Sequence, residues 1–134
     1  MQQSAEIREA MLRFYDRLSA NDVGSFDELV SQEPATLVIG TAPGERVTER
    51  AQLRYGFEAE GFRIEAGDPA GYEEGALGWL VDEPAFVFPD GSSFQTRLTA
   101  VMRQEDGRWK LVHMHVSVGV PDEEVVELQK RWSS

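Results

Sequence analysis

The sequence contains no cysteine, only two histidines, and 13 basic residues against 24 acidic ones. Without cysteine the chain cannot form a disulfide, a thiolate metal site or a thiol nucleophile. The formal net charge of −11 repels phosphate groups. We therefore expect neither nucleic acid nor an anionic membrane surface as a partner.

Long apolar runs are also missing. No stretch reaches the roughly 18 apolar residues of a membrane span. The N-terminal segment MQQSAEIREAM lacks the basic region and apolar run of a secretory signal. We therefore expect a cytoplasmic protein.

The composition that remains is that of one folded domain. Hydrophobic residues make up 41% and charged residues 28% of the 134 residues, which is ordinary for a globular chain. This length is enough for one core and too short for two comfortable ones. No internal repeat, low-complexity segment or linker interrupts the chain, so we predict a single domain over residues 1–134.

The first half of the chain has the pattern of helices. Four apolar residues recur at spacings of four, three and four: Ile7, Met11, Phe14 and Leu18. This stripe predicts an amphipathic helix over residues 4–20. The motif SFDE offers a capping box and predicts a short helix over residues 25–31. Thr48 can cap a helix, which predicts a third helix over residues 48–60.

The second half has the pattern of strands. Alternating runs are separated by the turn sequences DPAG, PDG and EDG, which is typical of an antiparallel meander and predicts a sheet over residues 62–119. The segment PDEEVVELQKRW places a proline and acids first and basic residues last, which predicts a terminal helix over residues 121–132. The predicted fold class is α+β, with helices first and then a long twisted sheet.

Both histidines lie in the last strand run, WKLVHMHVSVG. Alternation puts Val112, Met114, Val116 and Val118 on one apolar face, which should meet the helices. The opposite, outer face is half apolar and half polar, as in sheets that pair with a second copy. We therefore predict a homodimer interface on that face, made of Arg97, Thr99, Trp109, Leu111, His113, His115 and Ser117.

Two other roles for the histidines can be considered. A zinc site would need a third and a fourth ligand, which the sequence does not supply nearby, so we expect no metal. General acid–base catalysis by His113 or His115 stays open, and Tyr15 and Arg97 are further candidates for catalytic residues.

The segments VIGTAPGERVT, TRLTAVMRQEDGRWKLVH and HMHVS together resemble SnoaL-like domains of the nuclear transport factor 2-like superfamily. The resemblance covers nearly the whole chain. It implies a cone-shaped, cystatin-like α+β fold, in which a curved antiparallel or mixed sheet wraps around three N-terminal helices. It also implies a pocket between the long helix and the concave face, and dimers formed through the outer face.

The superfamily includes steroid isomerases, which use a tyrosine, a base aspartate and a second acid. On this sequence those three positions fall at apolar residues: Phe14 (next to Tyr15), Val38 or Ile39, and Leu98 or Ala100. The missing polar groups argue against isomerase chemistry.

The apolar faces also predict the lining of the implied pocket. The predicted lining residues are Met11, Phe14, Tyr15, Trp79, Leu98, Ala100, Met102, Val112, Met114 and Val116. Polar residues expected near the mouth are Tyr15, Glu45, Arg46, Glu49 and Arg97. Such a pocket suits a small apolar or aromatic molecule.

Two functions are compatible with this sequence. One is a dimeric domain that binds a small, largely apolar ligand without the acid–base residues of the isomerases. The other is a cofactor-independent enzyme, such as an isomerase, cyclase or lyase, that acts by proton transfer on a small cyclic substrate. The missing isomerase positions favour the first, and neither function requires a cofactor.

Overall fold

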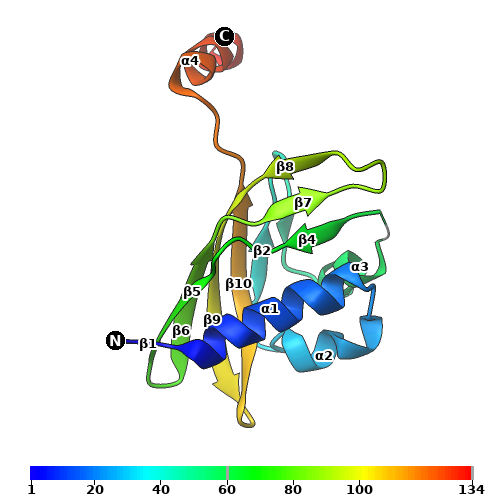
Figure 1. Ribbon diagram of the computed structural model, residues 1–134, viewed down its shortest axis with the longest axis vertical. Helices are drawn as coiled ribbons and strands as arrows, with labels where there is room; N and C mark the ends of the chain where they lie inside the picture. Colours follow the sequence, from blue (N-terminus) through cyan, green and yellow to red (C-terminus); the bar gives the residue numbers. More distant parts are fainter. Residues whose placement is uncertain (60, 134) are drawn as a thin grey trace.

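A computed structural model describes residues 1–59 and 61–133 and has the predicted α+β class (Figure 1). Its helices are α1 (Ala5–Ser19), α2 (Phe26–Leu29), α3 (Arg50–Glu58) and α4 (Asp122–Trp132), and a 3-10 turn, η1 (Val23–Ser25), precedes α2. None of the helices in the described ranges is long and apolar enough to cross a membrane.

Helix α1 forms because its cap and its apolar stripe agree. The Ser4 side chain accepts a hydrogen bond from the backbone N–H of Ile7 at 3.1 Å, which satisfies a free donor of the first turn. All four residues of the predicted stripe are buried: Ile7, Met11, Phe14 and Leu18. The helix stops where Asn21 takes a left-handed conformation with φ of 53°.

The strands form one large and one small sheet. The large sheet has the order β1-β5-β6-β9-β10-β2-β3. Its strands are β1 (Gln2–Gln3), β2 (Leu37–Ile39), β3 (Arg46–Val47), β5 (Ala70–Glu74), β6 (Leu77–Asp82), β9 (Arg97–Glu105) and β10 (Arg108–Ser117). The small sheet contains β4 (Arg63–Glu65), β7 (Ala85–Val87) and β8 (Ser93–Gln95). β2 runs parallel to β10, whereas β3 is antiparallel to β2 and β9 is antiparallel to β10, so the large sheet is mixed. The sheet also includes β1, β2 and β3, which precede the predicted start at residue 62.

Strand β10 contains a β-bulge that corrects part of the sequence analysis. Leu111 pairs with Met102, but His113 pairs with Val101, so Val112 is an extra residue without a partner on β9. The bulge shifts the alternation by one position. Trp109 and Leu111, predicted on the outer face, therefore point inward and are 9% and 1% exposed.

Two glycines let α1 approach the large sheet closely. A Cβ on Gly78 of β6 would overlap Ile7 Cδ1 and lie 2.6 Å from the Tyr72 carbonyl oxygen. A Cβ on Gly71 of β5 would lie 2.9 Å from Ile7 Cγ2. The first turn of α1 thus rests on strand backbone, which fixes the helix across the concave side of the sheet (Figure 1).

Helix α4 lies away from the rest of the structure, beyond the end of β10 (Figure 1). None of its residues is buried, and Trp132 is 71% exposed. Acids occupy its first turn and Lys130 and Arg131 its last, which suits the helix dipole. Its stability therefore owes nothing to the core of the domain.

Candidate functional site

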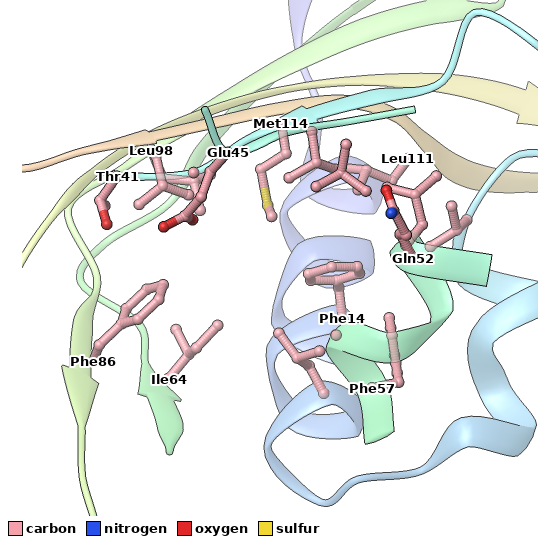
Figure 2. A pocket seen from close by; sticks show the side chains of 18 of the residues that line it. Phe14, Thr41, Glu45, Gln52, Phe57, Ile64, Phe86, Leu98, Leu111 and Met114 are labelled. Carbon is pink, nitrogen blue, oxygen red and sulfur yellow. The ribbon is translucent and has the colours of Figure 1, made fainter. Parts of the chain in front are cut away.

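A cavity of about 260 Å³ lies between the helices and the concave side of the large sheet (Figure 2). Its wall is assembled from α1, α2, α3, the β2–β3 hairpin, the small sheet and the strands β9 and β10. Among its described lining residues, the only polar side chains are Thr41, Glu45 and Gln52. The site is therefore an apolar chamber with few polar groups.

Five phenylalanines give this chamber its character, and we call it the aromatic cavity: Phe14, Phe26, Phe57, Phe62 and Phe86. Phe57 meets Phe14 edge to face, with ring centroids 5.5 Å apart, and meets Phe26 at the same distance. Phe62 and Phe86 stack in parallel at 5.6 Å. Such ring pairs favour fixed geometries, so the aromatic wall is formed before any ligand arrives.

The polar side chains of the aromatic cavity come from loop and helix rather than from the sheet. Thr41 and Glu45 belong to the turn between β2 and β3, and Gln52 belongs to α3. Figure 2 shows the Glu45 carboxylate beside Thr41, directed toward the side of the cavity where Phe86 and Ile64 lie. Glu45 is the one ionisable residue among the described lining residues.

The residues predicted to line a pocket divide into several groups. Phe14, Leu98, Met114 and Val116 lie on the wall of the aromatic cavity. Met11, Ala100 and Met102 are buried in the core and do not line it. Val112 is the half-buried bulge residue, and Trp79 lies on the outer face, 38% exposed and stacked on Tyr72 at 4.8 Å.

Several lining residues could not be assigned from the sequence. Leu111 reaches the wall only because of the bulge at Val112. Phe62, Ile64 and Phe86 reach it because the chain folds a separate small sheet over the opening of the cone. The aromatic residues Phe62 and Phe86 were a sequence signal for burial, but no neighbouring residue indicated that β4 and β7 leave the large sheet.

Tyr15 is buried but serves the core rather than the cavity. Its hydroxyl donates a hydrogen bond of 2.8 Å to Oδ2 of Asp82, and both residues are 3% exposed. Burial and the neighbouring Asp82 carboxylate raise the pKa of Tyr15 far above its usual range, so the hydroxyl stays protonated. Asp82 also accepts the backbone N–H groups of Gly67 at 3.3 Å and Glu83 at 2.8 Å.

The other three candidates for catalysis also lie outside the aromatic cavity. The Nδ1 of His113 lies 2.8 Å from the backbone carbonyl oxygen of Leu37, which fits a structural hydrogen bond. His115 is exposed, and the Nε of exposed Arg97 donates to the Ser117 hydroxyl at 3.3 Å. The described residues also contain no group of three or more histidine, aspartate or glutamate side chains placed to hold a metal.

The outer face of the large sheet combines apolar and polar side chains. We define it by the residues of β6, β9 and β10 that alternate with the buried ones: Leu77, Trp79, Val81, Arg97, Thr99, Val101, His113, His115 and Ser117. Cross-strand pairing places Trp79 beside Val101 and Val101 beside His113. With Trp109 and Leu111 turned inward, the apolar side chains of this face are Leu77, Trp79 and Val81 of β6 and Val101 of β9.

Comparisons with known proteins agree with this architecture. The model of the SnoaL-like domain family matches residues 7–121. No curated protein matches the chain significantly.

Solved structures with this fold include an NTF2-like protein of unknown function from Pseudomonas putida, with a TM-score of 0.75 and 16% identity over 92% of this chain and 94% of that one. A protein of unknown function with a cystatin-like fold from Nostoc punctiforme has a TM-score of 0.71 and 18% identity, with 89% and 96% covered. The association domain of C. elegans CaMKII has a TM-score of 0.68 and 17% identity, with 84% and 92% covered. These likenesses establish the cystatin-like fold and leave the function open.

Proposed function

The chain belongs to the SnoaL-like domain family, and we propose that it is a homodimeric domain that binds a small, largely apolar molecule in the aromatic cavity. The observation that carries the proposal is the cavity itself, about 260 Å³ with five phenylalanine rings in its wall. A volume near the lower end for ligand pockets and an apolar wall with few polar groups suit a molecule of one or two rings.

The positions of the four candidate catalytic residues favour ligand binding without catalysis. The Tyr15 hydroxyl is hydrogen-bonded to Asp82, and the His113 ring is hydrogen-bonded to the backbone carbonyl of Leu37. Arg97 and His115 belong to the outer face. A proton-transfer catalyst needs a titratable group within hydrogen-bond reach of its substrate, and none of these side chains lines the aromatic cavity.

A cofactor-independent enzyme is the second candidate, and Glu45 is the observation that favours it. Its carboxylate is the one ionisable group on the described cavity wall, and a carboxylate can act as a general base. This reading predicts that a bound cyclic carbon acid exchanges a proton with deuterated water in the presence of the wild type and not of Glu45→Gln. Binding without exchange supports the first candidate.

Ligand binding can be tested with a cavity-filling variant. Leu53 lines the cavity from α3 and is only partly buried, so Leu53→Trp should fit while occupying the chamber. We expect calorimetric titration with phenethyl alcohol to give binding to the wild type and none to Leu53→Trp. Val126→Trp, on α4 where the side chain is 49% exposed, should bind as the wild type does. Equal titrations for wild type and Leu53→Trp would contradict binding in this cavity.

The proposed dimer uses the outer face. Leu77, Trp79 and Val81 on one strand are 54%, 38% and 38% exposed, which leaves large apolar side chains in water on an otherwise ordered sheet. The proposal keeps Arg97, Thr99, His113, His115 and Ser117 from the sequence analysis and replaces the two inward residues by those of β6. One structural neighbour is described as an association domain, which fits assembly through this fold.

The dimer can be tested by sedimentation. Val81→Asp places a charge on the outer face beside Thr99, where a partner would have to desolvate it, and we expect it to sediment as a monomer while the wild type sediments as a dimer. Tyr55→Glu, at a side chain that is 64% exposed on α3, should leave the dimer intact. A wild-type monomer, or a Val81→Asp dimer, would exclude this interface.

A further inference from the structure

We propose that the aromatic cavity selects small aromatic or alicyclic amines in their protonated, ammonium form, with Glu45 as the group that recognises the charge. The inference rests on the proposed ligand-binding function and adds the chemical class of the ligand. It follows from where the Glu45 carboxylate points, from what surrounds it, and from the groups that it lacks.

The direction of Glu45 is set by a tight turn and by a glycine. The Gly40 N–H donates to the Glu45 carbonyl at 2.9 Å, the Glu45 N–H donates to Ala42 at 3.1 Å, and Gly44 has a φ of +83°. A Cβ on Gly40 would overlap the Glu45 carboxylate. Because position 40 has no side chain, the carboxylate can fold back over the strand end and reach the cavity (Figure 2).

The alternation of β3 supports the same direction. Val47 lines the cavity, whereas its neighbour Arg46 is exposed. Successive side chains of a strand point to opposite sides. Arg46 therefore faces away from the chamber and does not share it with Glu45.

Glu45 has no ionic partner in the described part of the chain. The ion pairs found there engage other acids, and in none of them does an arginine, a lysine or the N-terminus lie within 4.0 Å of its carboxylate. Its side-chain oxygens accept no hydrogen bond from protein groups there either. The acceptor capacity of this carboxylate is free for a ligand.

The walls around this carboxylate suit a cation with an apolar body. Phenylalanine faces attract ammonium groups through the ring quadrupole, and Phe86 lies on the same side of the cavity as Glu45 (Figure 2). Glu45 is itself exposed, so water screens its attraction for an ammonium group, and the apolar wall contributes by burying the ring of the ligand. The net charge of −11 adds a field that draws cations to the molecule and repels anions.

A matched set of three probes separates charge from shape. Phenethylamine, phenethyl alcohol and phenylacetate share a ring and differ at neutral pH in bearing a positive, no or a negative charge. In calorimetric titrations of the wild type we expect phenethylamine to bind about tenfold more tightly than phenethyl alcohol, a usual gain for one charge-assisted hydrogen bond. Phenylacetate should bind more weakly than both.

Two variants then assign the preference. Glu45→Gln keeps the size of the side chain and removes its charge, so the amine should lose its advantage of about tenfold while the alcohol binds unchanged. Glu49→Gln is the control, because Glu49 is an exposed acid of the same region that does not line the cavity. It should keep the wild-type order.

The outcomes distinguish this inference from the proposed function. If the alcohol binds as tightly as the amine in the wild type, or if the preference survives Glu45→Gln, charge recognition by Glu45 is refuted while ligand binding stands. If none of the three probes binds the wild type, the proposed function is refuted together with it. Equal losses in Glu45→Gln and Glu49→Gln would assign the preference to the overall charge and would also refute the role of Glu45.

Discussion

Replacing Tyr15 by phenylalanine should destabilise the protein without affecting the aromatic cavity. The change keeps the ring and deletes one hydroxyl, which donates a 2.8 Å hydrogen bond to Asp82. Asp82 is 3% exposed, so water does not readily replace the lost donor. The variant therefore tests whether this buried pair holds α1 to the end of β6.

The expected magnitude follows from the donors that Asp82 retains. A hydrogen bond to a charged group contributes about 1.5–3 kcal/mol. After the change, Oδ1 keeps the Glu83 N–H at 2.8 Å, whereas Oδ2 keeps only the longer Gly67 N–H at 3.3 Å. We therefore expect the free energy of unfolding to fall by about 2 kcal/mol, and Tm to fall on the order of 6–10 °C for a domain of this size.

Urea denaturation followed by far-ultraviolet circular dichroism measures this loss. Tyr55→Phe is the matched control, because Tyr55 is 64% exposed and its change should cost less than about 0.5 kcal/mol. The titration of phenethyl alcohol should be the same for wild type and Tyr15→Phe. If Tyr15→Phe is within about 0.5 kcal/mol of the wild type, the pair does not stabilise the fold, and a loss of ligand binding with no loss of stability would place Tyr15 in the site instead.

Three further outcomes follow from the structure. Burial raises the pKa of Tyr15, so Tyr15 ionises in the unfolded chain before it ionises in the folded protein as the pH rises. The stability advantage of the wild type over Tyr15→Phe should therefore be complete below about pH 10 and shrink above it. Urea denaturation of both proteins below and above this pH would measure the change. Gly56→Ala should raise the free energy of unfolding in urea by about 0.5–1 kcal/mol, since Gly56 lies inside α3 and a Cβ there meets no atom within 4 Å; a loss of stability would mean that the helix needs glycine. Ending the chain after Pro121 should change the free energy of unfolding by less than about 0.5 kcal/mol, because α4 buries no residue; a larger loss in a thermal melt would reveal a docking site for this helix.

The elements that sequence could predict are those decided by neighbouring residues. The stripe from Ile7 to Leu18 and the serine cap predict α1 because helix formation and amphipathic burial act over one or two turns. The alternating runs predict the paired strands β9 and β10 for the same reason. The curvature of the sheet was predicted from the family resemblance, which the match over residues 7–121 confirms.

The features that sequence could not predict depend on distant partners. Val112 and His113 are both acceptable in a regular strand, so the bulge arises from pairing with β9 and left no local signal. The buried pair joins residues 67 positions apart, and nothing near Asp82 marks it as a core residue. Glu45 was among the polar residues expected near the mouth, yet its direction depends on the missing side chain of Gly40, which only the turn geometry reveals.

The extra residue in β10 determines which set of side chains the last part of that strand shows to the cavity. With Val112 present, Met114 and Val116 face inward while His113 and His115 face outward. This arrangement depends on the bulge: if Val112 paired with Val101 as in a regular strand, His113 and His115 would lie opposite Ala100 and Leu98, and the two sets would be exchanged, because alternation has a period of two. Two imidazoles would then replace a thioether and an isopropyl group on the cavity wall. In this fold, a shift of one residue in the pairing of β10 separates an apolar chamber from one whose wall carries two imidazoles, and no substitution is needed to make the exchange.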